Sequence, residues 1–342
     1  MKINSYKNEI IFVTLIILFG LLLRGYNINF NDFWSDEMVT FYLSNPNINF
    51  TETIKLIFES NLMVSYELTL KFFHKIFGYN FEYSRYLTLT LSIVSIFYFY
   101  KLIKNNKNYY SALLGVILLS INIYHIRYSI ELRSYTLTFL LTIILLNFVF
   151  YQGKIREFKN FFSYFMIFII SFFMLFSHAF SIIVIISINF YIFLLWIIKK
   201  NYSKNNILLF LSTSISSLLF ILIYLNNISH TPYWIPEFKN SFFTNYYFSS
   251  FFGSRILGLL HLLILFYLII SQFNKVVKKF DIELFLTIFL LLTYIIPITY
   301  SLIFEPILID RYIFFVLIPI LYLISSLTLN FKNAYKKYTF IF

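Results

Sequence analysis

The chain alternates between long apolar runs and short polar segments that hold most of its charges. A membrane-spanning α-helix needs about 20 mainly apolar residues, and about 17 at the short end. Runs of this kind predict eight single spans, at Ile10–Gly25, Tyr86–Tyr100, Asn108–Tyr124, Ser134–Gly153, Asn205–Leu225, Ile256–Asn274, Leu284–Phe304 and Tyr312–Phe331.

A ninth run, Asn160–Ile198, carries no formal charge over 39 residues. As one helix it would be about 58 Å long, about twice the thickness of the hydrocarbon core. It is therefore predicted to be a hairpin of two helices that turns at Ser177–His178. The whole pattern predicts an all-α polytopic membrane protein with about ten transmembrane helices.

Two connections are longer than helix packing requires. The first, residues 26–85, has apolar residues at helical spacing in Thr53–Glu59 and Tyr66–Phe77, which is typical of amphipathic helices at a membrane surface. The second covers residues 226–254. We expect residues 1–342 to form one transmembrane domain without a separate soluble domain.

The composition supports this fold class. Of the 342 residues, 60% are hydrophobic and 12% are charged, against about 25% charged in an ordinary soluble domain. A chain of this kind is neither a soluble globular protein nor a disordered one. It has no cysteine, which excludes disulfides, thiolate metal sites and cysteine nucleophiles.

The 27 Lys and Arg against 15 Asp and Glu would suit nucleic acid if they formed one patch. Threaded from a cytoplasmic N-terminus, the ten spans instead place 17 of these basic residues, and every basic cluster, on one face. This positive-inside pattern predicts an integral plasma-membrane protein with both termini in the cytoplasm, and it argues against nucleic-acid binding. The first span lacks a signal-peptide cleavage site, so we expect a retained anchor.

Polar residues on the opposite, non-cytoplasmic face lie in connections that are far apart in the chain. Trp34–Glu37 follows the first span and brings two adjacent carboxylates, Asp36 and Glu37, to the bilayer surface, where they are costly unless paired, solvated or used. The connection before the fourth span carries Glu131 and Arg133. There the residues predict either a seat for a phosphate, which guanidinium binds bidentately, or a surface ion pair with a snorkelling arginine.

Three further polar positions share this face: Arg85, His178 and the pair Asp310–Arg311. Carboxylates and arginines at a lipid–water boundary suit a reaction between a phosphate-bearing lipid and a second substrate from outside. The chain has no GxxxxGK[ST] loop, no HExxH motif and no GxSxG motif. ATP-driven chemistry is therefore disfavoured, and metalloprotease and serine-hydrolase sites of those types are excluded.

Trp34–Glu37, which reads W-S-D-E, resembles the L-W-x-D-E motif that follows the first span in GT-C superfamily membrane glycosyltransferases of the dolichyl-phosphate-mannose–protein mannosyltransferase-like group (glycosyltransferase family 39, ArnT-like). Counterparts of the family's F-G and arginine, Y-S-Q-E-A-R-x-Y, T-H-Y and R-Y motifs follow in order at Phe77–Gly78 and Arg85, Tyr128–Tyr135, Ser177–His178, and Arg311–Tyr312 with Pro319. The resemblance runs through residues 20–325.

Three positions depart from the family's pattern. Leu62–Glu67 stands where the family has H-P-P-L-Y-Y, Ile130 replaces a glutamine, and Ala179 replaces a tyrosine. The missing histidine implies a changed acceptor specificity or reduced activity.

The resemblance implies an inverting glycosyltransferase that moves a sugar from a polyprenyl-phosphate donor to a lipid, glycan or protein acceptor on the non-cytoplasmic face. It implies Asp36 as the general base and Glu37 as a group that orients the acceptor or the surrounding helices. It assigns the donor phosphate to three arginines and other substrate contacts to four residues. The arginines are Arg133, Arg311 and Arg85, and the other four residues are Glu131, Tyr135, His178 and Trp34.

No organic cofactor is expected. A divalent metal ion stays open, because two adjacent acids can hold one but no His/Asp cluster requires it. Two other classes also remain: a carrier or flippase for a charged lipid, and an inactive paralogue acting as a scaffold. A carrier would place polar residues near the middle of its spans, whereas here the charges concentrate at one interface.

Overall fold

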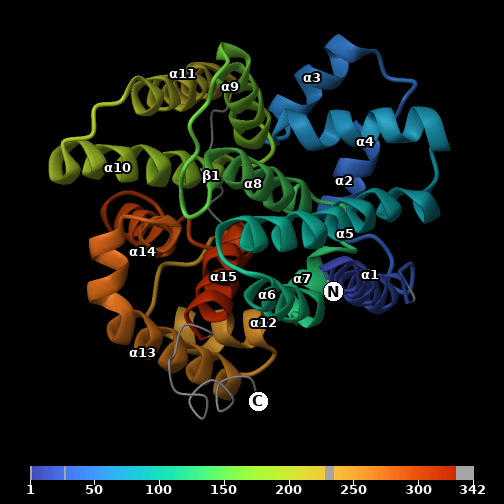
Figure 1. Cartoon of the computed structure of the whole chain (residues 1–342). Coiled ribbons are helices and arrows are strands. Elements are labelled where there is room, and N and C mark those ends of the chain that lie inside the picture. Colours follow the sequence, from blue (N-terminus) through green and yellow to red (C-terminus); the bar gives the residue numbers. More distant parts are fainter. Residues whose placement is uncertain (1, 27, 228–234, 329–342) are drawn as a thin grey trace.

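The structure is a computed structural model, and it describes residues 2–26, 28–227 and 235–328. Helices dominate it (Figure 1), and one two-stranded antiparallel hairpin joins α8 to α9. The elements are α1 (Lys2–Gly25), α2 (Ser35–Leu43), α3 (Phe50–Glu59), α4 (Val64–Phe77), α5 (Phe81–Asn106), α6 (Tyr109–Ile121), α7 (Ile123–Tyr128), α8 (Tyr135–Val149), β1 (Phe150–Tyr151), β2 (Lys154–Ile155), α9 (Phe161–Leu175), η1 (Ala179–Ser181), α10 (Ile182–Lys199), α11 (Lys204–Asn227), η2 (Phe242–Tyr247), α12 (Phe248–Phe252), α13 (Arg255–Lys279), α14 (Ile282–Ile303), η3 (Asp310–Val316) and α15 (Leu317–Thr328).

The chain is an all-α polytopic membrane protein, as its apolar runs predict. Among the described residues, five helical segments are long and apolar enough to cross a bilayer, and a sixth results if the bent pair Phe242–Phe252 and Arg255–Ser271 counts as one span. Shorter apolar helices of 13 to 15 residues form α6, α8 and α9. The count of ten spans therefore stays a prediction. The five segments are Phe81–Asn106, Ala179–Lys199, Lys204–Tyr224, Ile282–Ile303 and Asp310–Thr328.

The long apolar run folds as the predicted hairpin. Helix α9 ends at Leu175, the chain turns through Ser177 and His178, and the short 3-10 helix η1 leads directly into α10. The hydroxyl of Ser177 donates to the Met174 carbonyl oxygen and shares a hydrogen bond with Thr138 of α8. The turn is thereby fixed against the helix that follows the Glu131–Arg133 connection.

Three predicted boundaries were wrong, each for a local reason. Helix α5 begins at Phe81, because Asn80 caps it, so Arg85 lies in its first turns and not in the preceding loop. The third apolar run breaks at Asn122, whose side chain accepts from the His125 N–H and starts α7. Helix α8 stops at Val149, and the turn that follows has positive φ at Gln152 and Gly153.

The bundle is organised around α15, which lies near its centre (Figure 1). Every residue of this helix is buried, and it packs against α6, α13 and α14. Its predicted extension to Phe331 lies partly outside the described residues. A buried C-terminal helix fixes the position of η3, which directly precedes it and carries Asp310 and Arg311.

The first long connection folds into three helices that pack against the bundle beside α5, to which α4 is joined (Figure 1). Helices α3 and α4 contain the two predicted amphipathic segments, whereas α2 was not predicted. A compact apolar cluster joins this connection to α5, α8 and the connection between α7 and α8. Its buried members are Phe41, Tyr66, Leu70, Leu87, Leu132 and Leu137.

The second long connection, residues 226–254, is partly structured. Its described part contains the π-helix η2 and the short helix α12, while residues 228–234 lie outside the described part. Tyr247 and Phe251 are buried, and Phe251 stacks on Tyr124 with ring centroids 3.9 Å apart. This connection therefore packs against the start of α7.

Candidate functional site at the N-terminus of α2

Helix α2 begins immediately after Trp34 and places Asp36 and Glu37 in its first turn. Negative side chains are favourable there, because the first N–H groups of a helix point at them. Successive helical residues are rotated by about 100°, so two adjacent acids cannot point the same way. In this helix they enter two different environments.

Glu37 points inward and is 1% exposed. Its Oε2 lies 3.0 Å from Arg85 Nη2 in a buried ion pair, and its Oε1 accepts from Arg85 Nε at 3.4 Å. The same carboxylate accepts from two backbone N–H groups, that of Leu132 at 2.7 Å and that of Trp34 at 3.3 Å. Glu37 thereby ties α2 to α5 and to the connection between α7 and α8.

Arg85 is equally well supplied with partners. Besides Glu37, it donates to the carbonyl oxygens of Ile28, Asn31 and Asp32, and its guanidinium lies 4.6 Å from the centre of the Phe33 ring. Its side chain is 5% exposed. Arg85 therefore holds the segment that connects α1 to α2, and the structure does not bring it to the same place as the other two arginines of the predicted phosphate site.

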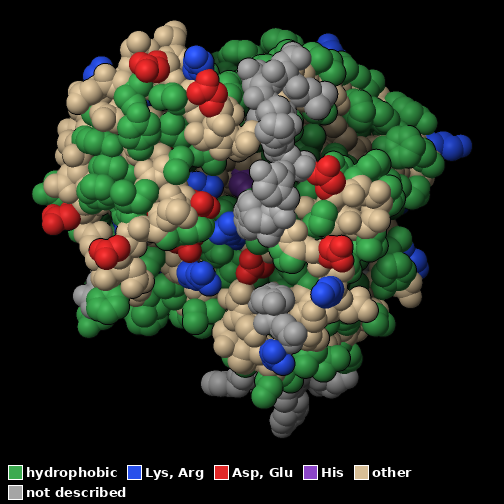
Figure 2. All heavy atoms as spheres, turned by 180° about the vertical axis from the view of Figure 1, so that it is seen from behind, with side chains coloured by type: hydrophobic (Ala, Val, Ile, Leu, Met, Phe, Trp, Pro, Cys, Tyr) green, Lys and Arg blue, Asp and Glu red, His purple; other side chains and the backbone are tan. Residues whose placement is uncertain are grey.

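Asp36 points to the other side, and its side chain is 34% exposed. Its Oδ2 lies 3.8 Å from Arg133 Nη2 and 3.9 Å from Arg311 Nη2. Figure 2 shows acidic and basic side chains gathered around a histidine in the middle of one face of the molecule. The structure thus unites one carboxylate with two guanidinium groups from connections 97 and 275 residues away.

The two arginines are held differently. Arg133 Nη1 donates to the Asp36 carbonyl oxygen at 3.2 Å and to Thr40 Oγ1 at 3.1 Å, so α2 fixes its direction. The Arg311 guanidinium lies 5.1 Å from the centre of the Trp34 ring, a cation–π contact. Trp34, which is partly exposed, therefore belongs to this cluster by contact.

His178 and Tyr135 adjoin the arginines. The His178 ring lies 5.0 Å from that of Tyr312 and 5.7 Å from that of Tyr135. Burial, together with the charges of Arg133 and Arg311, lowers the pKa of His178 to about 3. His178 is therefore neutral at physiological pH, which suits a hydrogen-bonding group and not a general base working near pH 7.

Glu131 lies at the edge of the cluster. Its Oε1 is 3.5 Å from Arg127 Nε, and its buried Oε2 has no hydrogen-bond partner among the described residues. Burial raises the pKa of Glu131 to about 7, against the lowering effect of Arg127. The structure brings Glu131 near Arg311 electrostatically, but its ion pair is made with Arg127.

Glu67, which the sequence did not single out, is a further acid beside this cluster. It lies in the first turn of α4 and is 3% exposed. Burial raises its pKa to about 7, and Arg133 is the charged group that opposes this shift. The available signal was its position: Glu67 ends the segment that stands in place of the family's H-P-P-L-Y-Y.

A second buried arginine was also missed. Arg24, at the end of α1, is 1% exposed and donates to Ser92 Oγ, to three carbonyl oxygens and to His125 Nδ1. His125 Nε2 in turn lies 3.2 Å from Ser95 Oγ. These bonds join α1, α5 and the junction of α6 with α7, which is a structural role. Sequence alone does not reveal it, because the partners are mostly backbone atoms.

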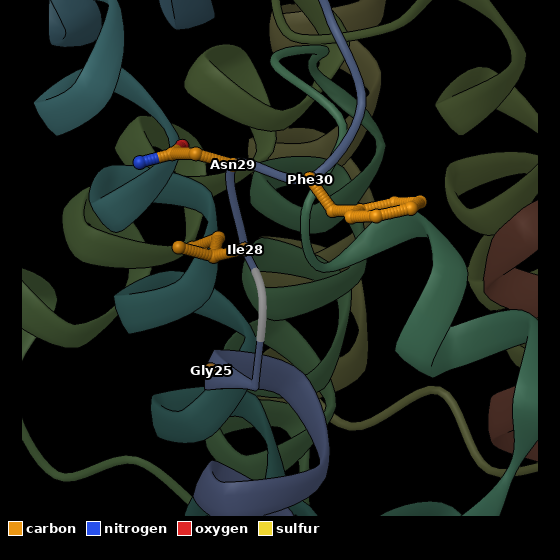
Figure 3. Close-up of a pocket in the computed structure, with 4 residues that line it drawn as sticks. All are labelled: Gly25, Ile28, Asn29 and Phe30. Carbon is orange, nitrogen blue, oxygen red and sulfur yellow. The ribbon is translucent and has the colours of Figure 1, made fainter.

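Two pockets open near the segment that follows α1. One, of about 430 Å³, is lined by Gly25, Ile28, Asn29 and Phe30, and Figure 3 shows Phe30 on the opposite side of the segment from Ile28 and Asn29. The other, of about 410 Å³, borders Arg85 and Met38. Neither is lined by Asp36, Arg133 or Arg311.

The pair Asp36–Glu37 does not converge on one point, because Glu37 is turned to Arg85. Within the described ranges, no group of three or more His, Asp or Glu side chains is arranged to hold a metal ion. The structure gives no specific support for a divalent ion between the two adjacent acids.

No protein-family model matches the chain, and no curated protein is similar to it in sequence. Among solved structures, it is similar to the crystal structure of ArnT from Cupriavidus metallidurans in the apo state, with a TM-score of 0.64 at 9% sequence identity. The match covers 96% of this chain and 61% of that chain. This likeness supports the GT-C fold, and it covers less than two thirds of the ArnT chain.

Proposed function

We propose that this protein is an inverting membrane glycosyltransferase that uses a polyprenyl-phosphate sugar as donor and a lipid, glycan or protein hydroxyl as acceptor. The observation that carries the proposal is the cluster of Asp36 with Arg133 and Arg311. The GT-C fold and the order of the motifs along the chain support it. The group named by the resemblance, glycosyltransferase family 39, is part of this proposal.

The cluster fits the charges of the reaction. An anion in the donor linkage needs guanidinium groups, and the acceptor hydroxyl needs a carboxylate that takes its proton. At 3.8 and 3.9 Å, the Asp36 contacts are longer than hydrogen bonds, which seldom exceed about 3.2 Å. A phosphate group can therefore compete with Asp36 for the guanidinium groups without first breaking a tight ion pair.

Each group then has one role. Asp36 accepts the proton of the acceptor hydroxyl as the hydroxyl oxygen attacks the anomeric carbon of the sugar. The bond from that carbon to the phosphate oxygen breaks, and the polyprenyl phosphate leaves with the electron pair. Arg133 and Arg311 stabilise the negative charge that grows on the departing phosphate. Because the phosphate is replaced from the opposite side, the sugar changes its anomeric configuration.

The neighbouring residues complete the site. We assign Trp34, Tyr135 and neutral His178 to contacts with the sugar or the acceptor, since all three adjoin the arginines. We assign Glu37 and Arg85 to positioning, because their charges are bound to each other and to the backbone. Phosphate binding in the proposal thus falls to Arg133 and Arg311.

The positive-inside pattern supports a non-cytoplasmic site. In a cysteine-free chain, single cysteines report sidedness cleanly. A cysteine at Asp32 is expected to react with an impermeant reagent added to intact cells, and a cysteine at Lys104 only after the cells are opened. The reverse result would place the site in the cytoplasm.

Purified protein in lipid vesicles tests the activity directly. Donors carrying different sugars on a short polyprenyl phosphate are incubated with membrane-extract acceptors, and release of polyprenyl phosphate is measured. Release that requires both acceptor and wild-type protein supports the proposal. Donor that moves across the bilayer unchanged indicates a carrier, and absence of both binding and turnover indicates a scaffold.

A further inference from the structure

A buried carboxylate lies beside the phosphate-binding cluster without a partner that neutralises it. Glu67 is 3% exposed, and its Oε2 has no hydrogen-bond partner among the residues that the structure describes. It also has no ion pair within 4.0 Å in that part of the chain. A buried carboxylate in this state is costly, so a structural role alone gives it no reason to be there.

The charged groups around Glu67 come from several elements. Arg133 reaches it from the connection between α7 and α8, and its charge is the one that favours the ionised form of Glu67. Tyr66 precedes it, with a buried hydroxyl that has no hydrogen-bond partner in the described chain. The other charged or titratable groups on the elements packed here are Glu37, which is bonded to Arg85, and His178, which follows the segment where Phe176 accepts from the Ser65 N–H.

Arg133 keeps its direction without help from Glu67, because α2 supplies two hydrogen-bond acceptors to its Nη1. The effect of Glu67 on Arg133 is therefore electrostatic. An ionised Glu67 attracts the guanidinium and repels any phosphate that binds to it, whereas a neutral Glu67 leaves the full positive charge to the phosphate.

We propose that Glu67 is a positioning residue that acts through Arg133: its charge weakens the hold of the site on a lipid phosphate and so promotes release of the polyprenyl-phosphate product. This inference rests on the proposed function. The product needs such a device more than the donor does, because a phosphate monoester carries more negative charge than the sugar diester that entered.

Binding measured against pH tests the inference. The probe is farnesyl methyl phosphate, a diester whose single charge does not change between pH 5.5 and 8.5, so any pH dependence comes from the protein. Burial raises the pKa of Glu67 to about 7, so Glu67 is mostly neutral at pH 6 and mostly ionised at pH 8. We expect wild-type affinity to fall about tenfold over this interval, and Glu67→Gln to bind tightly at both pH values.

Glu131→Gln is the matched control, because the pKa of Glu131 is also raised to about 7 by burial. It is expected to keep the wild-type fall in affinity, and this result supports the inference even where Glu67→Gln fails to fold. A fall that disappears in Glu131→Gln, or that persists in Glu67→Gln, overturns it. Wild-type protein that binds the diester at no pH overturns the proposed function itself.

Discussion

Asp36 and Glu37 are adjacent in the chain, yet they belong to two sites with opposite properties. Glu37 and Arg85 form a closed ion pair: the carboxylate receives hydrogen bonds from Arg85, Leu132 and Trp34, and both side chains are at most 5% exposed. Asp36, with Arg133 and Arg311, forms an open cluster in which the charged groups are partly exposed and nearly 4 Å apart.

The difference shows how a charge pair can serve structure or function. In the closed pair every group has a protein partner, so nothing is left to bind a substrate, and removing one charge leaves the other buried and uncompensated. In the open cluster the positive charge exceeds the negative charge of Asp36, and two guanidinium groups face a region that solvent reaches. The first arrangement positions the second, because Glu37 holds the connection that carries Arg133.

The largest expected effect is on catalysis by the open cluster. Asp36→Asn keeps the shape of the side chain but cannot accept a proton, so we expect the transfer rate to fall about 10²–10⁴-fold. Stability and diester binding should be close to wild type, since Asp36 makes no tight ion pair. Single-turnover kinetics with purified protein measures the rate. Turnover within threefold of wild type would move the role of base to another carboxylate.

The closed pair should instead respond in stability. Glu37→Gln leaves Arg85 buried without its counter-charge, and we expect a loss of about 3 kcal/mol in unfolding free energy, the lower end for a broken buried pair. Thermal unfolding in detergent measures it. Asp36→Asn serves as the control, one residue away. Equal stability of the two variants would remove the distinction between the sites.

Arg133 separates phosphate binding from simple charge. If its planar fork binds the phosphate, Arg133→Lys should weaken farnesyl methyl phosphate binding about 10–100-fold, nearly as much as Arg133→Ala, because an ammonium cannot reproduce a bidentate contact. Equilibrium binding at equal protein concentration measures this. Full binding by the lysine variant would show that Arg133 contributes charge alone.

The smallest expected effect concerns Glu131 at the edge of the open cluster. Burial raises the pKa of Glu131 to about 7 in the folded protein, above the model value of 4.5. Its neutral form is therefore favoured by folding, and the stability that this brings is present below about pH 4.5 and is lost as pH rises through about 7. Glu131→Gln should match wild type at pH 5 and be about 1–2 kcal/mol more stable at pH 8. Thermal unfolding at both pH values measures the difference, and a pH-independent difference would contradict the assignment.

Local sequence was sufficient for much of the architecture. The charge-free length of Asn160–Ile198 required a hairpin, and Ser177–His178 was the polar point at which it could turn, because a helix cannot extend far beyond the bilayer without polar residues. Helices α3 and α4 were readable from their apolar spacing. Helix α2 was not, since its nine residues give too short a pattern.

The sequence by itself determined which residues are chemically capable of forming the site: it identified Trp34, Asp36, Arg133, His178 and Arg311, which the fold brings into one region. Only the tertiary structure decided how the charges are divided. Arg85 reaches Glu37 across 48 residues, and Glu67 comes to lie beside Arg133 because α4 packs against α5. The physical reason is that the energy of a charge depends on its partners and its burial, and both are set by residues distant in the chain.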